Sequence, residues 1–235
     1  MKTNPTAAPP ASAGVTRFPE KRAYCFVKRS ADILIAFAAL VLLFVPLLVV
    51  LALDAIDLGC SPIFTQTRIG RGGKPFRIYK IRTMRKEAPR YRATGEFTDH
   101  VRYITRFGSL LRKLSVDELP QFFNVLEGSM SLVGPRPLIP EETGIHQMRH
   151  AAGVYDLRPG MTGLAQINGR DNVTAEEKVR LDALYLKNFG FRQDIRIILR
   201  SFKKVIMGDG VREGALPMPA AKAAADPASQ RRSSD

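Results

Sequence analysis

Residues 33–53 read ILIAFAALVLLFVPLLVVLAL, a run of 21 positions without a charged or polar side chain between Asp32 and Asp54. A helix that rises about 1.5 Å per residue would make this run roughly 32 Å long, close to the roughly 30 Å hydrocarbon core of a bilayer. A secretory signal fits poorly, because the run starts late, exceeds an ordinary h-region and lacks a small-residue cleavage site behind it. A buried core helix is rarely so long. The run therefore predicts a membrane segment.

The charges on either side of this segment bear on its topology. Residues 1–32 carry six basic and two acidic groups, and residues 54–86 carry eight basic and two acidic groups. The positive-inside tendency would keep both flanks in the cytoplasm, which a single span cannot do. Pro46 removes one helical hydrogen bond and predicts a kink. A helix that enters, bends at Pro46 and leaves on the same side satisfies both observations, and a kinked spanning helix is the alternative.

The composition sets limits on the rest of the chain. The 235 residues include 36 Lys or Arg and 22 Asp or Glu, which gives a net charge of +14 and implies an anionic partner. A hydrophobic fraction of 45% excludes a disordered protein, and two cysteines are too few for a disulfide scaffold. Residues 1–19 and 215–235 read as disordered tails. Between them we expect a membrane segment over 20–57 and a second domain over 58–214.

Several local patterns predict secondary structure after the membrane segment. Residues 63–68 and 75–81 look like two strands around a glycine-rich turn, which is not a Walker motif because Pro75 follows Lys74. Apolar side chains at helical spacing predict a helix over 99–114 and another over 195–206, the second either core-facing or interfacial. Thr174 and Glu177 form a capping box that opens a helix ending near Asn188. The predicted fold is α+β and mainly helical, with a small β-hairpin.

Asp117 and Glu118 lie in the stretch Ser115–Gln121, SVDELPQ. Ser115 and Glu118 have capping-box spacing, but Pro120 would then be the fifth helical residue, where its missing N–H matters. The helix is therefore expected to begin later, with both carboxylates at its mouth. There the helix dipole favours an ionised aspartate, which is a competent nucleophile toward phosphorus.

Two further stretches carry groups suited to phosphate. Prolines on both sides of Arg136 hold one guanidinium with little conformational freedom, and a guanidinium can bind phosphate in a bidentate manner. Residues 158–170 form a long loop in this interpretation, with Arg158 and Arg170 at its ends and Gln166 and Asn168 as hydrogen-bonding groups. Packed beside Asp117, these residues would form a diphosphate site. His146 and His150 have zinc-like spacing, but Gln147 stands where the protease motif needs glutamate, so incidental histidines are favoured.

Several longer motifs occur in a consistent order along residues 28–214. They are KRSAD (28–32), FTQ (64–66) with Arg68, FRIYKIRTM (76–84), LSVDELPQ (114–121), NVL (124–126), GSMS (128–131), VGPRP (133–137) and residues 158–170. On these motifs the chain resembles the bacterial sugar transferase family, the monotopic polyprenyl-phosphate phosphoglycosyltransferases that initiate glycan assembly. Relatives have a re-entrant membrane helix, often with serine before the bending proline, where this chain has Val45.

The resemblance implies a covalent exchange in two steps. Asp117 would attack the β-phosphorus of a UDP-sugar and displace UMP, and undecaprenyl phosphate would then take the sugar phosphate from the aspartate. Mg²⁺ would bridge Asp117 and the diphosphate, and Glu118 would orient the acceptor or the metal. The remaining site residues that it implies are Lys80, Arg82, Arg112 and Arg136 as phosphate contacts and Asp182 as a further functional acid.

The resemblance also implies a place of action, the cytoplasmic face of the bacterial inner membrane, with anionic lipid as a further partner. A nucleic-acid-binding protein would show an aromatic and basic surface or a known module, and neither is evident, so no nucleic-acid partner is expected. A non-catalytic membrane-tethered scaffold or regulator is the alternative. The sequence leaves open the sugar, the glycan pathway (exopolysaccharide, O-antigen or glycoprotein) and whether the chain forms a homo-oligomer.

Overall fold

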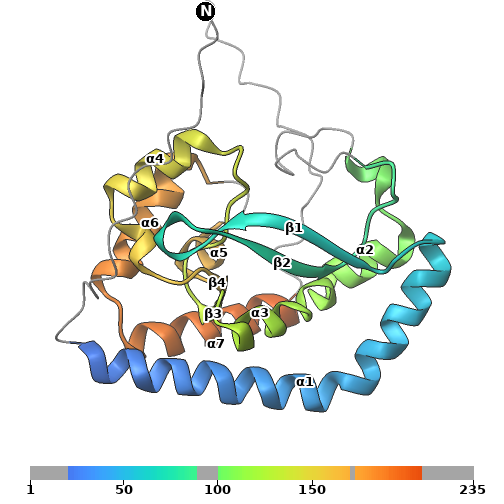
Figure 1. Cartoon of the computed structure of the whole chain (residues 1–235), viewed down its shortest axis with the longest axis horizontal. Coiled ribbons are helices and arrows are strands. Elements are labelled where there is room, and N and C mark those ends of the chain that lie inside the picture. The colour runs from blue at the N-terminus through green and yellow to red at the C-terminus, as the bar shows by residue number, and fades with distance from the viewer. Residues whose placement is uncertain (1–20, 89–99, 170–172, 208–235) are drawn as a thin grey trace, which may run out of the picture.

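The apolar run lies within one long helix, α1 (Arg22–Leu58), in a computed structural model that describes residues 21–88, 100–169 and 173–207. Pro46 is inside this helix, and helical structure continues through it. Figure 1 shows α1 running along the bottom of the molecule and then turning upward, so the segment bends but is not divided into two helices. The tails expected at residues 1–19 and 215–235 lie outside the described residues.

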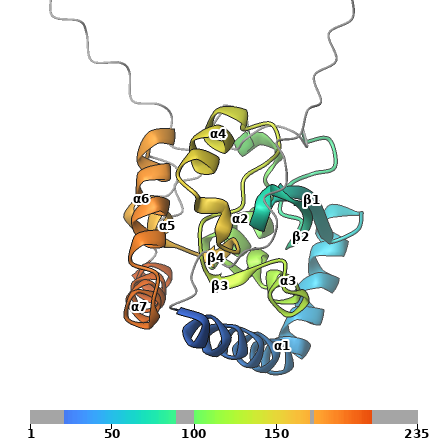
Figure 2. The same ribbon diagram turned by 60° about the vertical axis from the view of Figure 1, so that its left-hand side comes forward.

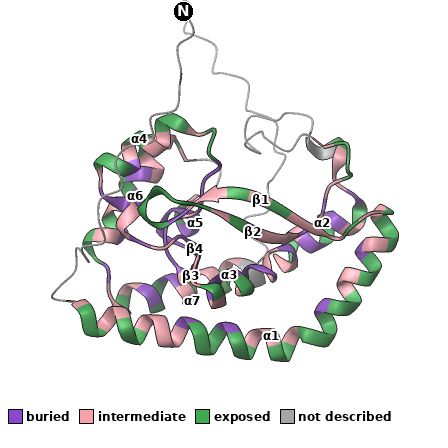
Figure 3. Cartoon of the chain, viewed as in Figure 1, coloured by how far each residue is buried: buried purple, intermediate pink, exposed green. Residues whose placement is uncertain are grey.

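One face of α1 packs against the rest of the protein. Its buried residues, Asp32, Ala36, Leu47 and Asp54, recur near helical spacing on that face. Large apolar side chains on other faces are exposed, including Leu42 at 79% and Val45 at 66%, and Figure 3 shows green running along most of the helix. Among the described residues, α1 alone is long and apolar enough to cross a membrane. These features fit membrane association.

The predicted hairpin is present. Strands β1 (Ile63–Ile69) and β2 (Pro75–Ile81) pair antiparallel from Ile63↔Ile81 to Ile69↔Pro75. The short 3₁₀ turn η2 (Arg71–Gly73) joins them, with Gly72 and Gly73 at φ of 69° and 71°, a conformation that favours glycine. Ile78 and Ile81 point into the core, so β2 connects the hairpin to the body of the protein.

The helix expected over 99–114 is wrong as a single element. A 3₁₀ turn, η4 (His100–Tyr103), is followed by α2 (Arg106–Lys113). Thr105 between them is extended, and its side chain accepts a hydrogen bond from the amide of Gly108 at 2.9 Å. The Thr105 amide donates to the carbonyl of Thr83, so pairing with that segment interrupts the helix that the apolar spacing suggested.

The loop expected over 158–170 is also wrong, because it contains regular structure. Strand β4 (Gly160–Thr162) pairs in parallel with β3 (Ser131–Val133), and the short helix α5 (Leu164–Asn168) follows. Helix α4 (Thr143–Ala151) and the 3₁₀ turn η6 (Val154–Asp156) lie between the two strands in sequence. The sequence pattern does not predict this small parallel sheet, because each strand is only three residues long and shows no clear alternation.

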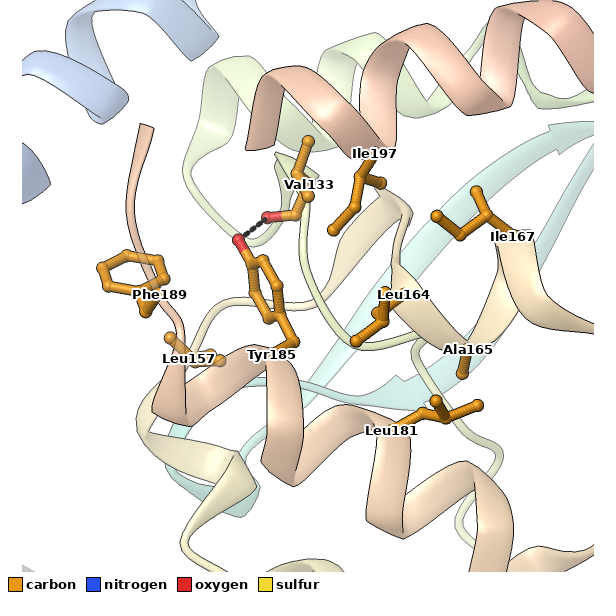
Figure 4. Packing of buried hydrophobic residues seen from close by; sticks show 9 residues of the cluster. All are labelled: Val133, Leu157, Leu164, Ala165, Ile167, Leu181, Tyr185, Phe189 and Ile197. Atoms are coloured by element: carbon orange, nitrogen blue, oxygen red, sulfur yellow. Dashed lines mark hydrogen bonds between the residues drawn. The ribbon is translucent and has the colours of Figure 1, made fainter. Parts of the chain in front are cut away.

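The helix predicted from the capping box is confirmed as α6 (Ala175–Lys187), with the Thr174 hydroxyl accepting from the amide of Glu177. Its Tyr185 is at the centre of a buried cluster shown in Figure 4. The Tyr185 hydroxyl lies 2.7 Å from a carboxylate oxygen of Asp194 and 3.3 Å from the carbonyl of Val133. These contacts join α6 to β3 and to the last helix.

That last helix, α7 (Phe191–Met207), has two apolar faces. Ile197 is fully buried in the core cluster, as the core-facing interpretation requires. Phe191, Leu199 and Phe202 are between 63% and 67% exposed, as the interfacial one requires. Figures 1 and 2 both place α7 beside α1 at one end of the molecule, with α4 at the opposite end.

Candidate active site

The paired carboxylates lie in a 3₁₀ turn, η5 (Val116–Glu118), just before helix α3 (Gln121–Glu127). Ser115 adopts a left-handed conformation, φ 55°, and its side chain makes no capping hydrogen bond. The helix therefore begins after Pro120, later than Ser115 as predicted, but the carboxylates expected at its mouth lie in the preceding 3₁₀ turn. Asp117 is only 9% exposed, so most of the water around a nucleophile at this position is excluded.

Glu118 brings two of the predicted cations together. Its Oε1 lies 2.8 Å from Nζ of Lys80, the last residue but one of β2, and 4.0 Å from Nη1 of Arg136. The side chains of Lys80 and Glu118 are 19% and 24% exposed, whereas that of Arg136 is 39% exposed. Groups from three separate segments thus meet at Glu118, the residue that follows Asp117 in sequence, and partial burial strengthens their electrostatic interaction with an anion.

The diphosphate-site hypothesis requires the Arg136 loop and residues 158–170 to pack together. The loop that carries Arg136 does pack against β4, which belongs to residues 158–170. The amide of Gly134 donates to the carbonyl of Thr162, and the amide of Gly160 donates to that of Pro135, each at 2.9 Å. A Cβ atom on Gly160 would lie 2.1 Å from the backbone nitrogen of Gly134. Glycine is therefore needed here for the close approach of two backbones.

Arg68 is a site residue that sequence reasoning did not assign. It lies on β1, and its guanidinium donates to the Gln66 side chain at 2.7 Å and to the carbonyl of Pro137 at 3.3 Å. Burial, together with the like charge of Arg136, lowers the pKa of Arg68 to about 10. The two-residue period of the hairpin could have shown that Gln66 and Arg68 share one face.

Two other predicted cations make hydrogen bonds to the segments around the hairpin. Nε of Arg112 donates to the hydroxyl of Thr83 at 2.6 Å, which ties α2 to the segment after β2. Nε of Arg82 donates to the carbonyl of Ser61 at 2.9 Å, and its guanidinium lies 5.7 Å from the centre of the Phe64 ring. Arg82 therefore holds the open end of the hairpin near the end of α1. Phosphate contacts by these two residues stay predictions.

The described residues predicted from 158–170 have hydrogen-bond partners away from Asp117 in sequence, or within their own segment. Nε of Arg158 donates to the carbonyl of Gly128, beyond the C-terminus of α3, whereas Asp117 precedes the N-terminus of that helix. Seven residues of helix separate these ends by about 10 Å. Gln166 donates to the carbonyl of Met161, and Asn168 to that of Leu164. Arg170 lies outside the described residues.

Asp182 is 1% exposed and forms an ion pair with Arg149, their side-chain atoms 2.6 Å apart. Burial raises the pKa of Asp182, and the positive charge of Arg149 opposes that shift. Arg149 also donates to the carbonyl of Arg136 at 2.7 Å. Sequence reasoning did not assign Arg149, since nothing in the pattern of α4 distinguishes it from a surface arginine.

Few side chains of the candidate site could serve as ligands of Mg²⁺. The described residues contain no group of three or more His, Cys, Asp or Glu side chains that could hold a metal ion. His146 contacts the Tyr155 hydroxyl through Nδ1 and the carbonyl of Ile139 through Nε2, which agrees with incidental histidines. Mg²⁺ commonly uses one or two carboxylates and takes its other ligands from substrate phosphates and water. Asp117 fits that pattern as a single protein ligand.

Comparison with known proteins agrees with this geometry. A family model described as bacterial sugar transferase matches residues 23–208. The uncharacterized sugar transferase EpsL of Bacillus subtilis (strain 168) is 40% identical over 187 residues, which cover 80% of this chain and 91% of that protein. A UDP-glucose:undecaprenyl-phosphate glucose-1-phosphate transferase of Caulobacter vibrioides is 41% identical over 194 residues, covering 77% of this chain and 70% of that protein.

A third relative is longer. The UDP-N-acetylgalactosamine-undecaprenyl-phosphate N-acetylgalactosaminephosphotransferase of Aeromonas hydrophila is 38% identical over 197 residues. The match covers 80% of this chain but only 46% of the Aeromonas protein. The similarity to that protein therefore concerns the part that this chain spans.

Proposed function

This chain belongs to the bacterial sugar transferase family, and on that premise we propose that it transfers a sugar 1-phosphate from a UDP-sugar to undecaprenyl phosphate and releases UMP. The observation that carries the proposal is the nearly buried Asp117, next to Glu118, whose carboxylate lies near Lys80 and Arg136. The names of the Caulobacter and Aeromonas relatives support the same reaction class.

The reaction proceeds in two displacements at one phosphorus atom. A carboxylate oxygen of Asp117 bonds to the β-phosphorus, and the bond from that phosphorus to the bridging oxygen breaks. UMP leaves with the electron pair. A phosphate oxygen of undecaprenyl phosphate then bonds to the same phosphorus, and the Asp117 carboxylate leaves unchanged. The product is a lipid diphosphate that carries the sugar.

The neighbouring charges suit this chemistry. Lys80 and Arg136 hold positive charge where the diphosphate places negative charge, and Glu118 keeps both side chains oriented before the substrate arrives. Arg68 adds a further positive charge beneath the Arg136 loop. When bound with the diphosphate, Mg²⁺ would neutralise phosphate charge, with Asp117 as its protein ligand.

The membrane arrangement that we propose is re-entrant, with both ends of α1 on the cytoplasmic side. At the start of α1, Lys28 pairs with Asp194 of α7 at 2.6 Å. Toward its end, Leu47 packs against Ile81 and Leu111. A helix that touches one body near both ends is hard to reconcile with a full span. The exposed apolar residues of α1 and α7 would then contact lipid, with the basic groups of α7 near anionic headgroups.

The product would feed bacterial surface-glycan assembly, such as that of an exopolysaccharide, an O-antigen or a glycoprotein. The identity of the sugar calls for assays with a panel of UDP-sugars, because the contacts described above involve groups suited to phosphate and not to a particular sugar.

The test compares Asp117→Asn with Asp57→Asn, a control at an exposed aspartate near the end of α1. The purified full chain is incubated with Mg²⁺, each UDP-sugar and a short-chain polyprenyl phosphate, and UMP release is measured. We expect Asp117→Asn to lose UMP release while keeping the wild-type melting temperature, and Asp57→Asn to keep both. Without acceptor, intact-protein mass spectrometry should find a sugar-phosphate adduct on wild type and on Asp57→Asn, but none on Asp117→Asn. Unchanged UMP release in Asp117→Asn would refute the role of Asp117, and no UMP release from wild type with any UDP-sugar would favour the non-catalytic scaffold.

A further inference from the structure

The loop around Arg136 is buried except for one side chain. Gly134, Pro135, Pro137, Leu138 and Ile139 are all buried, whereas the Arg136 side chain is 39% exposed and faces Glu118. Two prolines fix the backbone on either side of Arg136 and supply no N–H groups for regular structure. The position of this guanidinium therefore depends on what holds the loop from behind.

Five consecutive carbonyl oxygens of this loop have hydrogen-bond partners, and these come from three different elements. The partners of residues 135 to 139 are, in order, the amide of Gly160 (2.9 Å), Nη1 of Arg149 (2.7 Å), Nη1 of Arg68 (3.3 Å), the amide of Ile69 (2.9 Å) and Nε2 of His146 (2.7 Å). They belong to β4, α4 and β1. Such complete bonding of a segment outside any sheet or helix leaves it little freedom to move.

Arg149 bonds the carbonyl of the very residue whose side chain faces the carboxylates. It is 2% exposed and is held in turn by Asp182, 33 positions further along the chain, at 2.6 Å. Neither Arg149 nor Asp182 reaches the surface, so neither can touch a substrate without a rearrangement. The chain of contacts runs from Asp182 to Arg149, then to the Arg136 backbone and its guanidinium.

We propose that Arg149 and Asp182 are positioning residues that fix Arg136 for the diphosphate, and that Asp182 acts through Arg149 instead of contacting substrate. This inference rests on the proposed function, because it assigns Arg136 to the phosphate of that reaction. Displacing a catalytic group by about 1 Å can lower a rate on the order of a hundredfold. Loss of the Arg149 bond should thus lower kcat more than it changes KM for the UDP-sugar.

The decisive variant removes the hydrogen bond from Arg149 to the Arg136 carbonyl without leaving a buried charge unpaired. Arg149→Met combined with Asp182→Leu replaces the ion pair with apolar side chains of similar volume, a change that proteins often tolerate without loss of stability. The matched control is Arg180→Met with Glu177→Leu, which removes the exposed ion pair on α6, also 2.6 Å long. We expect the first double variant to lose about tenfold to a hundredfold in kcat and the control to keep the wild-type value.

A second measurement separates positioning from general support of the fold. In an Arg136→Ala background, the Arg149/Asp182 double replacement should cause no further loss of kcat, because the group it positions is already absent. Additive losses would overturn the proposal, as would wild-type kcat in the folded double variant.

A variant that keeps the charge covers the case in which the double replacement fails to fold. Arg149→Lys retains a cation beside Asp182 but cannot bond two partners with a planar fork. We expect a near-wild-type melting temperature with a lowered kcat, and unchanged kcat would contradict the inference. Failure of the proposed function looks different, because wild type itself would then release no UMP from any UDP-sugar.

Discussion

Nζ of Lys80 lies 2.8 Å from Oε1 of Glu118, and this contact joins the end of β2 to the turn that carries Asp117. The two residues are 38 positions apart in sequence. Strand β2 follows α1 through β1, so the contact places the turn with Asp117 and Glu118 at a fixed position relative to α1. An enzyme that joins a soluble nucleotide to a lipid phosphate needs such a link.

Replacement of Lys80 tests the charge in this contact. Lys80→Met should lower kcat/KM on the order of a hundredfold, because it removes a cation from the diphosphate and leaves Glu118 with less compensation. UMP release at varied UDP-sugar concentrations measures the effect. Lys74→Met, at an exposed lysine in the turn of the same hairpin, is the control and should leave kcat/KM unchanged. Equal losses in both variants would mean that the net charge of the hairpin matters, not its position.

Gly160 should tolerate no side chain. An added Cβ would lie 2.1 Å from the nitrogen of Gly134 and 2.4 Å from the carbonyl oxygen of Thr162. Gly160→Ala is therefore expected to destabilise the protein by about 1–3 kcal/mol and to reduce activity, since the Gly160 amide bonds the Arg136 loop. Gly144→Ala is the control, because a Cβ there meets nothing within 4 Å and alanine favours the helix by up to about 1 kcal/mol. Thermal unfolding of both variants would show opposite shifts.

The buried Tyr185 should make the free energy of unfolding fall as the pH rises into the alkaline range. Burial, with the negative charge of Asp194 close by, raises the pKa of Tyr185 in the folded protein above its usual 10.0. Above about pH 10 the unfolded chain loses this proton while the folded protein keeps it, so the free energy of unfolding falls as pH rises.

Tyr185→Phe should be less stable than wild type by about 1–2 kcal/mol near neutral pH, because it loses the hydrogen bond to Asp194. Its stability should fall less between about pH 9 and about pH 11 than that of wild type. Urea unfolding followed by circular dichroism measures both. Parallel pH curves for the two proteins would refute the assignment to Tyr185, since the lysines titrate in both.

The two cysteines report the topology of α1. Cys25 lies in its first turn and Cys60 just beyond its end, and both are free. If the helix is re-entrant, an impermeant thiol reagent added outside intact cells should label neither cysteine, and permeabilisation should expose both. Cys25→Ser and Cys60→Ser identify which position reacts. Labelling of one cysteine in sealed cells would establish a spanning helix.

Local sequence patterns predicted an element correctly where the residues that stabilise it lie within or next to that element. The hairpin follows from strand residues around glycines that accept positive φ, and α6 begins where Thr174 can cap it. The same reasoning located Asp117 and Glu118 before a helix, because Pro120 excludes an earlier start. It was wrong over 99–114, where apolar spacing suggests one helix but pairing between Met84 and Ile104 interrupts it.

The long apolar helix, the carboxylate pair and the family motifs can all be recognised from the order of residues, because hydrophobic length, proline geometry and residue identity are properties of short stretches. Which cations lie near Glu118 depends on how distant segments pack together. Lys80 and Arg136 meet at Glu118, whereas Arg158 lies at the other end of α3 and Asp182 lies behind the loop with Arg149. A long charged side chain can reach many partners. Burial and backbone packing between segments far apart in the chain determine which of them it contacts.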